Sequence, residues 1–235
     1  MLDARFKAMG RVAAWSLWVC TPTLLESLVG TVRRDVCDRR IAWWSKRMVD
    51  GVGMRIEVRG REHLEPHEPM LVMSNHQSHY DVPALFQSLP GSVRMVAKTE
   101  LFRIPIFGGA LRAAEFVEVD RGNRASAIAS LHDARRLFQS GISVWIAPEG
   151  TRSPDGRLGP FKKGGFILAE EADVPILPVS VDGTHRILPA KTADLRFDQA
   201  VKVTIHPRIR RSEVASREAW MERVRRSIAS GLPNP

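Results

Sequence analysis

The chain has 235 residues, of which 44% are hydrophobic, and these values suit one globular domain with a sizeable core and exclude a mainly disordered protein. Its formal net charge of +9 predicts an acidic partner, such as nucleic acid, an anionic membrane surface or a phosphorylated substrate. Because no RNA-recognition signature, zinc-finger spacing or helix-turn-helix pattern accompanies the charge, nucleic acid is not expected as a partner. Two cysteines without C-x-x-C spacing predict neither a disulfide framework nor a thiolate zinc site.

The N-terminal stretch from residue 12 to residue 32 is apolar and about as long as a membrane span. Pro22 and Glu26 interrupt it, arginines flank it, and Trp43 and Trp44 follow beside cationic side chains, as is typical of the headgroup layer. This pattern predicts an amphipathic two-helix hairpin that lies partly in one leaflet. Two helices packed on the core, or a true crossing, are the alternatives. No cleavage site of a signal peptide is evident.

From residue 53 onward, apolar runs that resemble strands alternate with helical patterns. The strand candidates are "MRIEVRG", "MLVMSN", "VRMVAK", "EFVEV", "ISVWIAP", "VPILPVSV" and "VKVTIHP". The helical candidates are "VPALFQSL", "ASAIASLHDARRLFQSG", "GGFILAEEA" and a basic C-terminal helix, "SREAWMERVRRSI", expected to cover the sheet. This alternation predicts an α/β fold with a mixed, largely parallel sheet flanked by helices, preceded by the membrane-associated hairpin. The predicted division is residues 1–52 for the anchoring segment and 53–235 for the catalytic domain.

A cluster of polar side chains, "NHQSHYD" at residues 75–81, follows one of these strands. It admits a metal site with His76, His79 and Asp81, a nucleophilic Ser78, or a general base His76 oriented by Asp81. Ser78 lacks the glycines of a nucleophile elbow, and no further cluster of metal ligands is evident. The third alternative requires a turn, because side chains five residues apart diverge by roughly 140° on a helix. Without further support, ordinary surface polarity explains the pair equally well.

Further polar clusters follow other strands, at the sheet edge where open α/β sheets place ligands. "VEVDRGNR" contains Arg121, whose guanidinium suits a phosphate or pairs with a neighbouring aspartate. "APEGTRS" contains Glu149, which bonds a substrate hydroxyl or holds its loop, with Gly150 and Arg152. "FKKGGF" adds two lysines near a helix start. The two prolines of "VPILPVSV" predict an edge or irregular strand.

These motifs together closely resemble the lysophosphatidate (1-acylglycerol-3-phosphate) acyltransferase family of the bacterial type. Four blocks occur in the order of that family, namely "NHQSHYD", "VEVDRG", "PEGTRS" and "VPILPV", over residues 75–179. The second block, with its sequence V-E-V-D-R, departs from the aromatic or isoleucine-rich run that many members have at this place. The N-terminal two-helix segment also resembles that of the bacterial members.

The resemblance implies that His76 is the general base and Asp81 its orienting partner. It also implies a substrate-binding set, with Pro178 in the acyl-side motif: Lys98, Arg121, Glu149, Gly150, Thr151, Arg152 and Pro178. The expected reaction moves a fatty acyl group from acyl-CoA or acyl-carrier protein to lysophosphatidate, without a metal or other cofactor.

The resemblance further implies a monotopic or peripheral protein of the inner (cytoplasmic) membrane, with an anionic membrane surface as partner and the catalytic domain in the cytoplasm. The alternatives are an acyltransferase for another lyso-lipid, such as a lyso-ornithine lipid, and a non-catalytic protein that binds anionic lipids.

Overall fold

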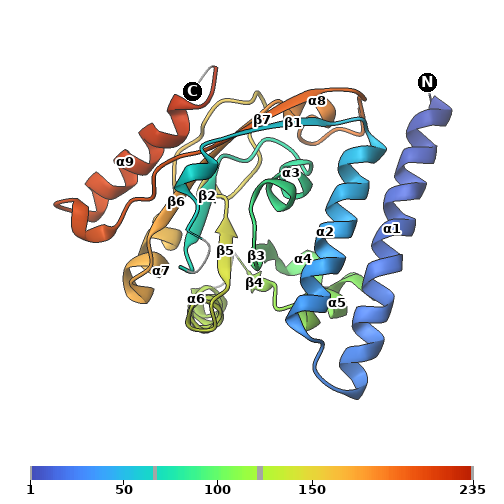
Figure 1. Cartoon of the computed structure of the whole chain (residues 1–235), viewed down its shortest axis with the longest axis horizontal. Coiled ribbons are helices and arrows are strands. Elements are labelled where there is room, and N and C mark those ends of the chain that lie inside the picture. The colour runs from blue at the N-terminus through green and yellow to red at the C-terminus, as the bar shows by residue number, and fades with distance from the viewer. Residues whose placement is uncertain (1, 66–67, 121–123, 234–235) are drawn as a thin grey trace.

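A computed structural model describes residues 2–65, 68–120 and 124–233 of the chain (Figure 1). Within these residues the strands are β1 (Arg55–Arg59), β2 (Leu71–Ser74), β3 (Val93–Lys98), β4 (Val117–Val119), β5 (Ser143–Ile146), β6 (Ile176–Asp182) and β7 (Ala200–Ile205). The helices are α1 (Leu2–Val29), α2 (Arg34–Gly51), α3 (Asp81–Ser88), α4 (Thr99–Phe102), α5 (Phe107–Ala113), α6 (Arg124–Gln139), α7 (Gly164–Ala172), α8 (Thr184–Ile187) and α9 (Arg217–Ser230). All seven predicted strands are therefore confirmed.

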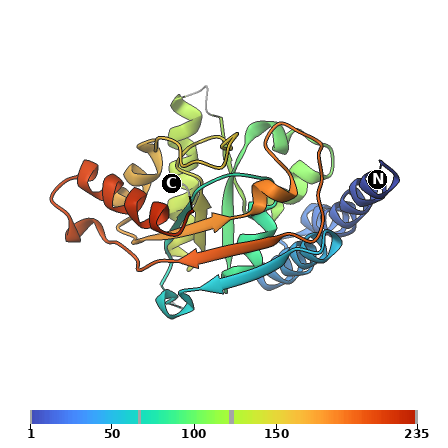
Figure 2. The ribbon, with the colours of Figure 1, turned by 90° about the horizontal axis from the view of Figure 1, so that it is seen from above.

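The seven strands form one sheet in the order β1-β7-β6-β2-β5-β3-β4. Strand β2 pairs in parallel with β5 and β6, β3 pairs in parallel with β4 and β5, and β1 pairs in parallel with β7. Only the β6–β7 pair among these is antiparallel, and Figure 2 shows β6 running against β7 and β1. The predicted mixed, largely parallel α/β sheet is confirmed. Five strands thus end at one edge of the sheet, which gathers the polar residues that follow them.

Strand β6 lies inside the sheet, so the expectation that its prolines mark an edge strand is wrong. Pro178 pairs with Met73 of β2, and its carbonyl accepts a hydrogen bond from the His206 backbone N–H. Three residues separate Ile205 from Ile209 on the β7 side, against two between their partners on β6, so the chain after β7 bulges opposite Pro178. The missing N–H of the proline faces this bulge, where no ladder bond is required.

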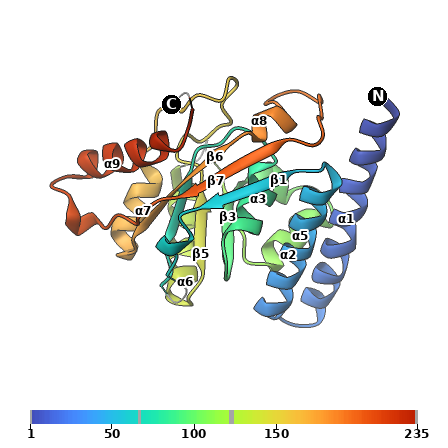
Figure 3. The same ribbon diagram turned by 45° about the horizontal axis from the view of Figure 1, so that its top comes forward.

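Helices cover both faces of the sheet and bury two apolar clusters. Helices α2 and α3 pack on one face against the side chains of Val72, Leu177 and Val179. Helices α6, α7 and α9 pack on the other face (Figure 3). The C-terminal helix α9 buries Trp220 and two aliphatic side chains on its inner side, which confirms that it covers the sheet.

The N-terminal residues form a helical hairpin, α1 and α2, at one end of the molecule (Figures 1 and 3). The Phe6–Val29 part of α1 is long and apolar enough to cross a membrane, judged by length and composition alone, and only 11% of its apolar window is buried. Helix α2 packs on α3, while α1 packs on α2 and α5. The two predicted helices are therefore present, and their membrane association stays a prediction.

Polar contacts fasten this hairpin to the rest of the protein. Asp38 of α2 accepts a hydrogen bond of 2.7 Å from Arg94 of β3, whose side chain is 1% exposed. Arg34 donates two hydrogen bonds of 2.8 Å to Glu115, which precedes β4. These contacts cross the predicted boundary at residue 52, so the hairpin is packed as part of the fold.

Candidate active site

The candidate site begins where β2 ends. Residues 75–80 form an irregular turn, and α3 begins directly at Asp81. This turn brings His76 Nδ1 to 2.7 Å from Asp81 Oδ2. Two side chains five residues apart can meet only through such a turn. The same carboxylate oxygen accepts the backbone N–H groups of Gln77 at 2.7 Å and Ser78 at 3.0 Å. The turn therefore folds around the carboxylate.

The Asp81 carboxylate fixes the proton position on the His76 ring. Asp81 is fully buried, and its second oxygen accepts a hydrogen bond from the Thr184 hydroxyl at the start of α8. Four donors thus satisfy a buried carboxylate that would otherwise be costly to desolvate. Because an ionised carboxylate only accepts, the proton of neutral His76 lies on Nδ1 and the lone pair lies on Nε2. His76 can therefore act as a base through Nε2, and its side chain is 19% exposed.

Aromatic and amide side chains fasten the turn of residues 75–80 to the sheet. The Trp145 ring of β5 meets the His76 ring edge to face, with centroids 6.1 Å apart, and its indole N–H donates to Ser74 Oγ at 2.9 Å. Asn75 exchanges two hydrogen bonds of 2.8 Å with the backbone of Val181 in β6. The position of His76 is therefore set by three neighbouring strands, β2, β5 and β6.

Glu149, in the loop after β5, holds backbone groups of this site. One carboxylate oxygen accepts the backbone N–H of His76 at 2.7 Å, and the other accepts the backbone N–H of Gly159 at 2.8 Å. Glu149 is 6% exposed, and burial raises the pKa of its carboxyl group. Of the two roles that the sequence allows for Glu149, these contacts match the one in which it holds the loop.

The rest of the "EGTRS" loop lies beside His76 and carries positive charge. The Ser153 backbone N–H donates to the His76 carbonyl at 2.7 Å, so the loop is bonded to the turn of residues 75–80. Arg152 is half-buried, and Thr151 is exposed. Desolvation lowers the pKa of His79, and the nearby positive charge of Arg152 lowers it further. The described part of the chain shows no carboxylate paired with Arg152.

Lys162 adds to the positive charge of this loop, and Lys98 stands at the end of β3. Gly150 has a φ of +73°, and a Cβ atom there would lie 2.9 Å from Lys162 Cε, so the lysine side chain crosses directly over the glycine. Both the backbone conformation and this contact favour glycine. Lys98 is exposed at the end of β3, in register with Val119 at the end of β4. Neither lysine has a carboxylate partner among the residues that the structure describes.

The remaining predicted residues are placed as follows. Arg121 lies outside the described residues. Pro178 is buried within β6, where its described contacts belong to the sheet, so its role toward an acyl chain stays a prediction. His79 is exposed, and within the described ranges no three histidine, cysteine or acidic side chains gather as metal ligands would.

Several residues of the site were not predicted. Thr184 bonds Asp81 from 103 positions away, and Trp145 supports the His76 ring from inside an apolar strand. His185 bonds the Gln77 side chain, which in turn donates to the Gly156 carbonyl at 2.9 Å. The polar run "DGTHR" after β6 was the available signal for Thr184 and His185, since polar residues at other strand ends form this site.

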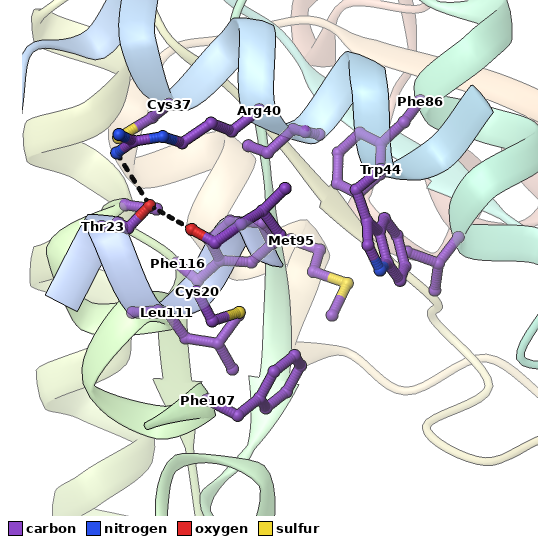
Figure 4. A pocket seen from close by; sticks show the side chains of 15 residues that line it. Cys20, Thr23, Cys37, Arg40, Trp44, Phe86, Met95, Phe107, Leu111 and Phe116 are labelled. Carbon is purple, nitrogen blue, oxygen red and sulfur yellow. Dashed lines mark hydrogen bonds between the residues drawn. The ribbon is translucent and has the colours of Figure 1, made fainter. Parts of the chain in front are cut away.

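An apolar cavity lies between the hairpin and the sheet, next to α3 (Figure 4). Val82, the residue after Asp81, lines it together with side chains of α1, α2 and α5. Figure 4 shows Trp44 and Phe86 on one side of the cavity and Thr23 and Arg40 on the other, with Arg40 donating to Thr23 at 3.0 Å. At the start of α3, Asp81 therefore contacts His76, and the next residue, Val82, lines this cavity.

Comparisons with known proteins show to which family the chain belongs. The Acyltransferase family model matches residues 55–182. A chloroplastic 1-acyl-sn-glycerol-3-phosphate acyltransferase of Brassica napus is 38% identical over 65% of this chain and 44% of the relative. The human 1-acyl-sn-glycerol-3-phosphate acyltransferase alpha is 41% identical over 54% of this chain and 45% of the relative. The chain thus spans about half the length of these curated relatives.

A solved structure matches nearly the whole chain. The crystal structure of the 1-acyl-sn-glycerophosphate (LPA) acyltransferase PlsC from Thermotoga maritima superposes with a TM-score of 0.84 and 26% sequence identity. The match covers 98% of this chain and 93% of that chain, so it includes the N-terminal hairpin.

Proposed function

Because the chain belongs to the acyltransferase family, we propose that it transfers a fatty acyl group from a thioester to the free hydroxyl of lysophosphatidate, giving phosphatidate. The observation that carries the proposal is the His76–Asp81 pair, in which Nε2 of His76 keeps its lone pair, together with Arg152 on the adjacent loop, which has no carboxylate partner among the described residues. A base beside a cation suits an acceptor that joins a hydroxyl to a phosphate. The names of the relatives support the same acceptor.

In the proposed mechanism, Nε2 of His76 removes the proton of the acceptor hydroxyl while its oxygen attacks the thioester carbonyl. Asp81 keeps the ring in the Nδ1–H tautomer and stabilises the imidazolium that forms. The tetrahedral intermediate then collapses and releases the thiol of coenzyme A or of acyl-carrier protein. The proton returns from the imidazolium to that thiolate. Since no acyl-enzyme is formed, the kinetics are sequential.

Arg152, Lys98 and Arg121 are proposed to bind the acceptor phosphate, with Gly150 and Thr151 shaping the approach beside them. The position of Arg152, on the loop bonded to His76 and close to His79, supports its assignment, whereas Lys98 and Arg121 are included on the family resemblance alone. An arginine can bind two phosphate oxygens at once, and holding the phosphate aligns the hydroxyl with Nε2. Glu149 is proposed to support this subsite through the loop that it bonds.

The apolar cavity beside Val82 is proposed to receive the acyl chain. Its walls are almost wholly apolar, and it lies next to the helix that begins at Asp81. Residues 1–52, which form most of one wall, are also proposed as the membrane-anchoring segment, and residues 53–235 as the catalytic domain. We place the protein on the inner (cytoplasmic) membrane as a monotopic or peripheral protein, with an anionic lipid surface as partner and its catalytic domain in the cytoplasm.

The test is an acyl-transfer assay with the full chain, acyl-CoA and acyl-carrier-protein donors, and a panel of acceptors. Lysophosphatidate should be the preferred acceptor, and His76→Ala should abolish transfer, whereas His79→Ala should have a far milder effect. Preference for a lyso-ornithine lipid or another lyso-phospholipid would keep the chemistry and reject the acceptor. Activity lost on chelation and restored by zinc would reject the metal-free mechanism, and binding of anionic lipid without transfer would reject the enzyme.

Arg152→Ala tests the phosphate subsite separately. The KM for lysophosphatidate should rise at least tenfold, because a charge-assisted bond to a phosphate contributes about 1.5–3 kcal/mol. The KM for the thioester donor should change little. An unchanged acceptor KM would remove Arg152 from the phosphate site.

A further inference from the structure

The turn between α4 and α5 has an unusual backbone. The Phe107 N–H donates to the Pro105 carbonyl at 2.7 Å, two residues back, and Ile106 between them has φ 66° and ψ −53°. This is the γ-turn with positive φ, which is rare and strained. For a β-branched residue such a conformation is an outlier that the surrounding structure must hold in place.

Internal packing does not account for this strain. Ile106 is 38% exposed and Ile104 is 46% exposed, although both side chains are large and apolar. The turn is nonetheless held firmly, because Gly108 donates to the Ile104 carbonyl at 2.8 Å and a Cβ on Gly108 would lie 2.0 Å from the Phe102 carbonyl oxygen. The fold thus builds a rigid corner that presents two isoleucines outward.

The apolar surface of this corner continues that of α1. Helix α5 packs alongside α1, and a Cβ on Gly109 would lie 2.6 Å from Leu24 Cδ1. Leu17 and Leu28 are seven and four residues from Leu24, so they share its stripe of the helix. They are 50% and 73% exposed. An exposed apolar stripe of α1 therefore runs beside α5, the helix that follows the turn.

We propose that the turn of residues 103–107 is a second membrane contact, inserted beside α1 into the boundary between headgroups and acyl chains of an anionic bilayer. The bilayer is the occupant that the exposed surface fits, because Ile104 and Ile106 extend an apolar face already long enough for a membrane, and the exposed Arg103 next to them suits anionic headgroups. This inference rests on the proposed membrane association.

The position of the turn connects the bilayer with the apolar cavity. Phe107 follows Ile106 directly and lines that cavity, as does Leu111 one helical turn later (Figure 4). A bilayer contact at Ile106 places the cavity wall at the membrane surface. An acyl chain then has a short path from the lipid phase to the cavity, without crossing water.

The test combines vesicle binding with thermal unfolding of the full chain. The variant Ile104→Ser/Ile106→Gly removes both exposed side chains, and glycine accepts the positive φ. Vesicles of phosphatidylglycerol and phosphatidylcholine serve as the probe. Each partly exposed isoleucine contributes roughly tenfold to partitioning by the area rule, so binding should weaken by about 10- to 100-fold. The Tm of Ile106→Gly alone should stay equal or rise, because strain is relieved.

Leu28→Ser on α1 is the matched control for the membrane face itself. Weaker binding of both the turn variant and Leu28→Ser supports the second contact. If Leu28→Ser weakens binding and the turn variant binds like the wild type, the turn proposal is overturned while the α1 face stands. If neither variant changes binding, both the turn and the proposed membrane face are overturned. A clear fall in the Tm of Ile106→Gly with unchanged vesicle binding would show that the turn only supports the fold.

Discussion

The replacement Asp81→Asn removes one charge from the site and leaves its hydrogen bonds almost intact. The asparagine carbonyl oxygen can take the place of Oδ2, which accepts from His76, Gln77 and Ser78. The asparagine amide then faces the Thr184 hydroxyl, which can turn and accept where it now donates. Every contact survives and one is reversed, so we expect the Tm to fall by only a few degrees.

The expected loss of activity comes from the lost charge. A carboxylate within about 4–6 Å favours the charged form of a neighbouring group by about 1–3 pKa units, or about 1.4–4 kcal/mol. The proposed transition state contains an imidazolium and loses this stabilisation in Asp81→Asn. We therefore expect kcat to fall by about 10- to 1000-fold. The KM for lysophosphatidate should stay nearly unchanged, because the proposed phosphate cations lie on other loops.

Steady-state kinetics and thermal unfolding of three variants test this reasoning. Asp81→Ala leaves three N–H donors without an acceptor in a buried site, each at a cost of about 1–3 kcal/mol, so it should be clearly less stable than Asp81→Asn. His76→Ala sets the lower limit of activity. If folded Asp81→Asn keeps at least half of the wild-type kcat, the charge of Asp81 does not stabilise the transition state, and the proposed stabilisation of an imidazolium by Asp81 is refuted.

Three further predictions concern stability and the loop cations. Burial, with the charge of His63 adding to it, lowers the pKa of His206 to about 4. Between about pH 6.5 and pH 4 this histidine therefore binds a proton in the unfolded chain before it does in the folded one, so lowering the pH over this range should reduce the free energy of unfolding by up to about 3 kcal/mol. Urea unfolding of His206→Asn should show a flatter pH dependence than the wild type, and an identical dependence contradicts the assignment. Lys162 crosses over Gly150 in the same loop as Arg152, so we expect it also to attract the acceptor phosphate, and Lys162→Ala should raise the KM for lysophosphatidate several-fold. Lys163→Ala should not raise this KM, because Lys163 already pairs with a glutamate at 3.4 Å; equal effects would reject this role of Lys162. Asp38→Ala leaves the buried Arg94 without its carboxylate and should destabilise the protein by about 3 kcal/mol in calorimetry. This value is at the low end of the usual range because Asp38 is partly exposed. An unchanged Tm would show that this ion pair does not stabilise the fold.

The periodicity of apolar residues predicts the sheet well and the short helices poorly. Strands such as β2 and β6 are continuous apolar runs, because helices cover both faces of the sheet. Helix α5 was not predicted because Gly108 and Gly109 have low helix propensity, although packing against Phe102 and Leu24 requires small residues there. Pro178 indicated an edge strand because a sequence does not show that the neighbouring strand bulges opposite it.

For the site, local spacing predicts contacts within a turn and misses contacts between turns. The His76–Asp81 contact lies within seven consecutive residues, so the sequence could propose it, with the turn that it needs, once the family resemblance favoured this pair. The bond from Thr184 to Asp81 depends on the register of β2 against β6, in which Ser74 lies opposite Val179. A single sequence does not contain that register. The same limit applies to Glu149, which follows β5 and accepts the backbone N–H groups of His76 and Gly159, contacts that depend on how the strands and loops come together.

Helix α3 links the turn of residues 75–80 to the N-terminal hairpin, so the membrane role of the hairpin cannot be tested by deleting it. Its first residue, Asp81, orients His76, while Val82 lines the apolar cavity that the hairpin closes. Gln87, near its end, donates to Ser45 of α2 at 2.7 Å. Removing residues 1–52 would uncover α3 and open the cavity along one wall, so loss of activity in a truncated chain would not separate anchoring from catalysis. Substitutions on the exposed face of α1, such as Leu28→Ser, test the proposed membrane contact without disturbing the helix that carries Asp81.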